Sequence, residues 1–143
     1  MSRSTECRSA EFLTRGPISP RMHGTLDYLL AAVLLAGPFV FDFDRATATA
    51  TVLVIGVAAA GLAVGTAWSR GIVHLVPPLL HGVLDVGATI ALIAAPFLGG
   101  FRGDRVATGF CLVIGGGGLA ATLLTRFVSD LPVRASGSTQ PAL

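Results

Sequence analysis

Long stretches without a charged side chain are the feature that most constrains this chain. Between Arg45 and Arg70 there are 24 consecutive uncharged residues, and a helix needs about 20 apolar residues to cross a bilayer. Three further uncharged stretches cover residues 28–41, 86–101 and 106–125. Only 13% of all residues are charged, against about 25% in an ordinary soluble domain. Most of the surface must therefore face lipid.

These stretches predict four membrane-spanning helices. Lipid offers the backbone no hydrogen-bond partner, so a spanning segment is a helix or part of a closed barrel. No segment alternates apolar and polar residues with the period of two that a strand requires. We therefore expect helices over residues 22–41, 46–68, 78–98 and 105–127. The polar residues 1–21 read as a flexible cytoplasmic tail, and residues 128–143 as a disordered one.

A repeated motif relates the two halves of the chain. His23-Gly24-Thr25-Leu26-Asp27 recurs 58 residues later as His81-Gly82-Val83-Leu84-Asp85. With a shift of one residue, Val54-Ile55-Gly56 then matches Val113-Ile114-Gly115. Each unit holds two spans, at residues 22–68 and 78–127, so both units have the same orientation and a pseudo-twofold axis lies along the membrane normal. The predicted fold is an all-α integral membrane four-helix bundle built from two tandem helix-pair repeats.

In each repeat this motif is followed by an apolar run and then by Pro-Phe. This order resembles that of the SPW-repeat membrane proteins of bacteria. In that family a Ser-Pro-Trp motif lies in the first of two transmembrane helices, and the unit can occur twice. Here the motif reads Gly37-Pro38-Phe39 and Ala95-Pro96-Phe97, so the proline is kept and Phe replaces Trp. The resemblance covers residues 21–127. It implies this architecture and no particular reaction.

The candidate site consists of two His-Asp pairs. His23 and Asp27, like His81 and Asp85, are four residues apart and therefore lie on one helix face. The twofold axis would let the pairs meet near the cytoplasmic end of the bundle. In the simplest interpretation each Asp lies one turn inside its helix, orients its His, caps the helix and bonds to a neighbouring helix.

Two functional interpretations of these pairs stay open. Ionisable residues inside a membrane are candidates for a proton or ion path. Imidazole paired with carboxylate is also typical of metal or haem sites, which His23 and His81 could form together with His74. We expect neither a metal nor another cofactor, because two or three His without Cys ligands are a weak signal.

Catalysis is the least supported class of function. No Ser or Cys nucleophile lies near a His in the sequence, and no Gly-rich phosphate loop is present. We therefore predict no catalytic residues and a structural or interaction role. The alternative is a small proton- or ion-coupled carrier or channel that uses the His-Asp pairs, followed by a haem- or metal-binding protein.

The distribution of Arg predicts the orientation of the chain. One side of the membrane would hold seven Arg and the other three, which places both termini in the cytoplasm and the protein in the cytoplasmic membrane. The partner we expect is the lipid bilayer, with a second copy of the chain or another membrane protein as further candidates. No aromatic-basic stripe indicates nucleic acid. Cys7 and Cys111 are expected to be free thiols, since a disulfide would draw the polar tail into the membrane.

Small residues and prolines predict how the helices pack and end. Pro38 and Pro96 should end their helices near the outer interface, with Phe39 and Phe97 as anchors. Close helix approach is expected at glycines of the second and fourth helices, which are Gly61, Gly65, Gly115, Gly116, Gly117 and Gly118. These two helices would cross near the pseudo-axis, with a homodimer through the same faces as the alternative. The run of four glycines also predicts a local helix distortion.

Overall fold

The fold is known from a computed structural model, which describes residues 17–66 and 75–125. These residues form four helices and no β-strand. The helices are α2 (Pro20–Val40), α3 (Ala46–Gly65), α4 (Pro78–Leu98) and α5 (Arg105–Leu123). Each contains a segment long and apolar enough to cross a membrane. The predicted all-α membrane bundle is therefore confirmed.

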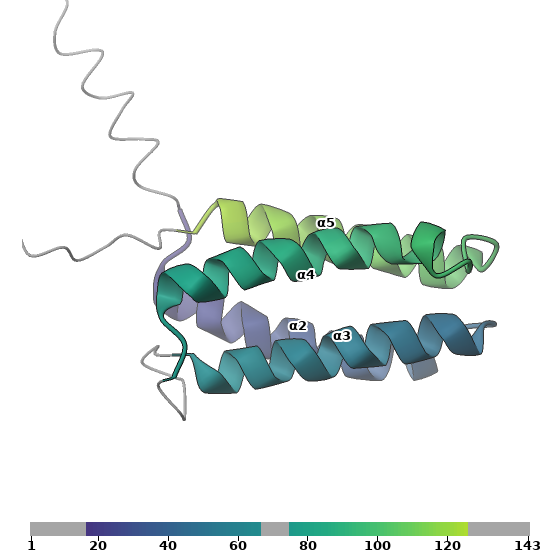
Figure 1. Cartoon of the computed structure of the whole chain (residues 1–143), viewed down its shortest axis with the longest axis horizontal. Coiled ribbons are helices and arrows are strands. Elements are labelled where there is room, and N and C mark those ends of the chain that lie inside the picture. The colour runs from purple at the N-terminus through teal and green to yellow at the C-terminus, as the bar shows by residue number, and fades with distance from the viewer. Residues whose placement is uncertain (1–16, 67–74, 126–143) are drawn as a thin grey trace, which may run out of the picture.

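The helices pack as two pairs that follow the sequence repeat. Helix α2 packs on α3 and α4 packs on α5, whereas the pairs meet mainly through α3 with α4 and α2 with α5. All four helices run along the long axis of the molecule, with one pair above the other (Figure 1). The starts of α2 and α4 lie at the same end of the bundle as the ends of α3 and α5. Helices α2 and α4 have 21 residues each and begin at prolines.

The second helix of each pair is shorter than predicted. Helix α3 ends at Gly65, because Thr66 is extended (φ −87°, ψ 143°) and the N–H groups of Leu75 and Val76 donate to the Gly65 carbonyl. In the other repeat, the N–H of Ile18 donates to the carbonyl of Leu124. The charge pattern could not predict these ends, since the uncharged stretches run past them.

The prolines lie close to the helix ends. Helix α2 ends at Val40 and α4 at Leu98, each two residues after its proline. Phe39 and Phe97 are 68% and 58% exposed and face outward. Phe101, by contrast, is fully buried in the core.

Glycines bring together the helices within a pair. A Cβ at Gly115 would lie 2.7 Å from Cγ1 of Ile93 on α4, and one at Gly56 would lie 3.0 Å from Cβ of Leu34 on α2. A Cβ at Gly61 would meet no described atom within 4 Å. The predicted crossing of α3 and α5 at their glycines is therefore wrong. The predicted distortion is also absent from α5, which runs unbroken from Arg105 to Leu123.

The buried apolar core combines equivalent residues of the two repeats. Leu34 and Leu92, 58 residues apart, are 1% and 2% exposed and belong to one cluster. The cluster also holds Cys111, whose thiol is free and buried. Cys7 lies outside the described residues.

Candidate functional site

Four ionisable side chains meet where the two repeats face each other. His23 and Asp27 come from α2, and His81 and Asp85 come from α4; we call these four residues the His–Asp quartet. Both histidines are 1% exposed and Asp27 is 9% exposed, and the Asp85 side chain is 17% exposed. One ligand atom from each residue can be chosen so that all four lie within 4.8 Å of one another. The quartet is thus a single compact and largely buried polar group.

Each imidazole contacts the carboxylates of both repeats. Nε2 of His23 lies 3.0 Å from Oδ2 of Asp85 and 3.5 Å from Oδ1 of Asp27. Nε2 of His81 lies 3.2 Å from Oδ2 of Asp27 and 2.9 Å from Oδ2 of Asp85. The two rings are 5.8 Å apart between centroids and nearly perpendicular. The quartet therefore joins the repeats through two crossed His-Asp contacts.

The carboxylates do not cap their helices, contrary to the sequence-based interpretation. Asp27 and Asp85 are each the eighth residue of a helix, because α2 and α4 begin at Pro20 and Pro78. That position is about 10 Å along the helix axis from the first residue. In α2 the cap is Ser19, whose hydroxyl oxygen accepts from the N–H of Met22. The two carboxylates therefore lie too far from the free N–H groups at the helix starts to cap them.

Two threonines contact the Nδ1 atoms of the histidine rings, the ring nitrogens that do not face the carboxylates. The Thr66 hydroxyl lies 2.6 Å from the carbonyl of Leu62 and 2.6 Å from Nδ1 of His81. A hydroxyl has one hydrogen: if it goes to the helix carbonyl, the oxygen accepts from Nδ1, and if it goes to Nδ1, the ring proton is on Nε2. The Thr125 hydroxyl likewise lies 2.7 Å from the carbonyl of Ala121 and 2.9 Å from Nδ1 of His23. Both threonines are thus placed to accept a bond from a protonated Nδ1.

The histidine tautomer decides what the centre of the quartet must contain. With Nδ1 protonated, Nε2 of a neutral imidazole holds a lone pair, and it faces carboxylate oxygens that also hold lone pairs. In this tautomer such atoms repel at distances of 2.9 to 3.5 Å unless a cation lies among them, either as a second ring proton or as a metal ion. In the other tautomer Nε2–H donates to the carboxylates, as in the 3.0 Å hydrogen bond between His23 and Asp85. Two protons or one divalent ion would balance the two carboxylates.

The threonines were missed at the level of sequence. Thr66 and Thr125 are 59 residues apart, the same offset that relates Val54-Ile55-Gly56 to Val113-Ile114-Gly115. Extending that register to the ends of the second helices would have found them. His74, considered as a further ligand, lies outside the described residues.

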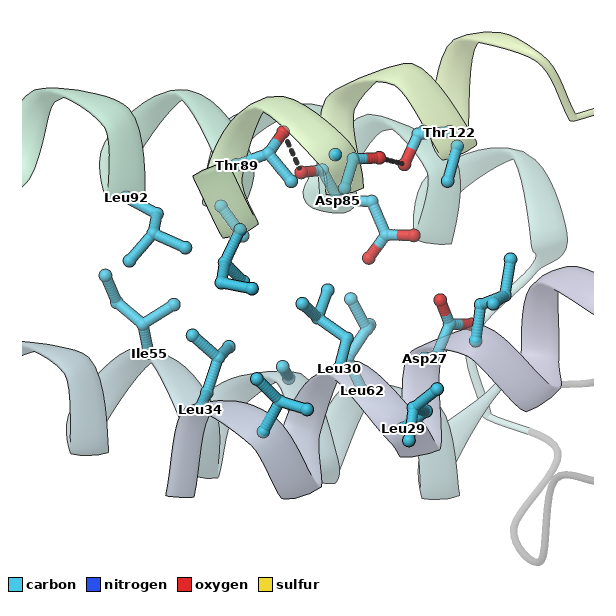
Figure 2. A pocket seen from close by; sticks show the side chains of 18 of the residues that line it. Asp27, Leu29, Leu30, Leu34, Ile55, Leu62, Asp85, Thr89, Leu92 and Thr122 are labelled. Atoms are coloured by element: carbon cyan, nitrogen blue, oxygen red, sulfur yellow. Dashed lines mark hydrogen bonds between the residues drawn. The ribbon is translucent and has the colours of Figure 1, made fainter. Parts of the chain in front are cut away.

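A cavity of about 520 Å³ extends from the quartet between the two helix pairs. Figure 2 shows Asp27 and Asp85 at one end of this space, from opposite sides, and Leu34, Ile55 and Leu92 farther along. Leu29, Leu84 and Val113 line the cavity and are at least 45% exposed. The cavity therefore reaches the outer surface of the bundle and has mainly apolar walls.

Asp104 is a further buried carboxylate, outside the quartet, and its contacts are structural. Its oxygens accept from the N–H of Ala107 at 2.9 Å and from the N–H of Arg45 at 3.2 Å. Asp104 thereby caps α5 and ties it to the start of α3. Among the described residues, the quartet is the one group of His, Cys, Asp or Glu side chains arranged to hold a metal ion.

Comparison with known proteins identifies the family. No curated protein and no solved structure matches the chain. The family model described as SPW repeat domain matches residues 21–131, which include the quartet and all four helices apart from the first residue of α2. The chain therefore belongs to the SPW repeat domain family.

Proposed function

We propose that this chain is a non-catalytic, cation-binding protein of the cytoplasmic membrane, with both termini in the cytoplasm. The observation that carries the proposal is the His–Asp quartet, in which the Nε2 atoms of two imidazoles and the oxygens of two carboxylates face one another. An ionisable residue at the centre of a membrane helix costs about 2.5–3.5 kcal/mol on insertion scales. Binding of a cation offsets this cost, because it neutralises both carboxylates together.

The orientation rests on the Arg distribution. In the sequence, seven of the ten Arg precede residue 22, fall between α3 and α4 or follow α5, and positive residues favour the cytoplasmic side. The quartet lies nearer to this side, about 10 Å into the helices. A cation would therefore reach it more readily from the cytoplasm or through the cavity.

A variant with an apolar quartet tests whether the site exists for binding or for folding. We expect His23→Leu, Asp27→Leu, His81→Leu and Asp85→Leu, combined in one chain, to leave stability unchanged or raised. Replacing a complete buried ionic group by apolar residues is often neutral or stabilising by about 1–4 kcal/mol. The measurement is thermal unfolding of the detergent-purified protein, followed by circular dichroism.

Asp27→Leu alone is the matched control for this variant. It leaves the remaining charges unbalanced and should destabilise the protein by about 3–5 kcal/mol. If the fourfold variant unfolds as readily as this single variant, the quartet is a structural clamp and the cation-binding role is wrong. The structural or interaction role would then be the correct one.

The cavity favours a second candidate function, a small ion-coupled carrier. Its mainly apolar walls lead from the outer surface of the bundle to the two carboxylates. A carrier would move protons or metal ions across vesicles made of phosphatidylethanolamine and phosphatidylglycerol. Flux that is lost in folded Asp85→Asn supports this candidate, and flux no greater than in empty vesicles rejects it.

A further inference from the structure

We propose that the cation held by the quartet is a single divalent transition-metal ion, bound by Nε2 of His23 and His81 and by one carboxylate oxygen each of Asp27 and Asp85. This assignment rests on the cation site proposed above and names its ligand. The sequence alone gave only a weak signal for it. The geometry of the described residues supplies four further observations.

The spacing of the ligand atoms suits a tetrahedral ion. Nitrogen and oxygen ligands lie about 2.0–2.2 Å from Zn²⁺, so neighbouring ligands of a tetrahedral site are about 3.3 Å apart. With Oδ2 as the ligand atom of both carboxylates, three Nε2–oxygen distances are 2.9, 3.0 and 3.2 Å. One ligand atom from each residue can be chosen within 4.8 Å of the others, so an ion would draw the more distant atoms together by about 1 Å.

The threonines provide the outer contacts of a metal site. A histidine that binds a metal almost always donates its other ring N–H to an oxygen, which fixes the ring and its tautomer. The hydroxyl oxygens of Thr66 and Thr125 lie 2.6 and 2.9 Å from Nδ1 of His81 and His23, where they can accept such a bond. With Nδ1 protonated, both Nε2 lone pairs are directed at the centre of the quartet.

One carboxylate oxygen favours a metal ion over protons. Oδ2 of Asp27 is buried and has no hydrogen-bond partner among the described residues, although it lies 3.2 Å from Nε2 of His81. A proton on an imidazole neutralises charge but serves only the oxygen toward which it points. A central ion contacts all four ligand atoms at once, including this one.

The donor set narrows the kind of ion. Two imidazoles suit Zn²⁺, Fe²⁺, Ni²⁺ or Cu²⁺, and two carboxylates extend the range to Mn²⁺. Mg²⁺ and Ca²⁺ prefer sites made of oxygen alone. The carboxylates lie against both Nε2 atoms, and the ring centroids are only 5.8 Å apart. A porphyrin would not fit between the two rings, so the site suits a bare ion.

Metal binding by the full chain in mild detergent tests the assignment. After removal of metal with a chelator, the protein is titrated with Zn²⁺ alone and with Co²⁺ alone. We expect one ion per chain, not displaced by excess Mg²⁺, and the intense visible bands of tetrahedral Co²⁺. In Asp27→Asn and His81→Gln the affinity should fall by more than about 100-fold, the upper end of losses caused by outer-contact mutations.

Asp42→Asn is the matched control, since Asp42 is exposed in the α2–α3 connection and Asn also tolerates its positive φ of 50°. It should bind Zn²⁺ like the original chain. Circular dichroism and elution volume identify the variants that fold. If Asp27→Asn does not fold, the Zn²⁺ affinity of His81→Gln tests the assignment. A folded original chain that binds neither ion overturns the metal assignment, as does equal binding by the quartet variants. The stability of the apolar quartet variant still tests the cation site independently.

Discussion

At the scale of single residues, the structure explains how ionisable groups are held inside a membrane bundle. The repeat offset of 58 identifies His23, Asp27, His81 and Asp85 from the sequence, because spacing by four places each pair on one helix face. The tautomer of the histidines could not be predicted in this way. It depends on two hydroxyls that are distant in sequence, at the ends of the other helices.

Replacing those hydroxyls should weaken the site without unfolding the protein. Thr125→Val keeps the shape of the side chain but removes the acceptor for Nδ1 of His23, so the ring loses its fixed tautomer. We expect Zn²⁺ affinity to fall by about 10- to 100-fold. The measurement is competition for Zn²⁺ with a chromophoric chelator.

Thr51→Val is the control for this change. Thr51 makes the same bond to the carbonyl four residues earlier, but it is half-buried on α3 and bonds to no histidine in the described structure. Its Zn²⁺ affinity should stay unchanged. Equal effects of Thr51→Val and Thr125→Val would mean that the threonines act only through their helices.

At the scale of the helices, sequence patterns predicted the number of elements better than their ends or contacts. The uncharged stretches predicted all four helices, since crossing a bilayer sets their length. They did not show that α3 ends at Gly65, because this end depends on backbone bonds from Leu75 and Val76. Nor could glycine content show which glycines contact a helix, because that depends on rotation about each helix axis.

Two glycines of the same run in α5 should therefore respond differently to alanine. A Cβ at Gly115 would lie 2.7 Å from Ile93 Cγ1 and 3.2 Å from the carbonyl oxygen of Thr89, whereas one at Gly117 meets no described atom within 4 Å. Gly115→Ala should destabilise the protein by about 1–3 kcal/mol through overpacking. Gly117→Ala should be neutral or stabilising by up to about 1 kcal/mol.

Thermal unfolding of both variants in the same detergent measures this difference. The two substitutions add the same methyl group to the same helix, so each is the control for the other. Equal stability of the two variants would contradict the close packing of α5 on α4 described above.

At the scale of the whole molecule, two helix pairs enclose a polar site and an apolar cavity. Each pair packs tightly within itself, whereas the pairs meet through fewer contacts and leave about 520 Å³ between them. The repeat predicted the pseudo-twofold arrangement. It could not predict the cavity, because the cavity depends on the distance between the two helix pairs. A cation at the quartet would add a bond across this weaker interface.

The most direct test of the cation site is X-ray absorption at the zinc edge of the Zn²⁺-loaded chain. We predict four nitrogen or oxygen ligands at about 2.0–2.2 Å, with the multiple-scattering signature of two imidazoles. Asp27→Asn should lose this environment. A sulfur shell at about 2.3 Å would place the ion on cysteine and contradict binding by the His–Asp quartet.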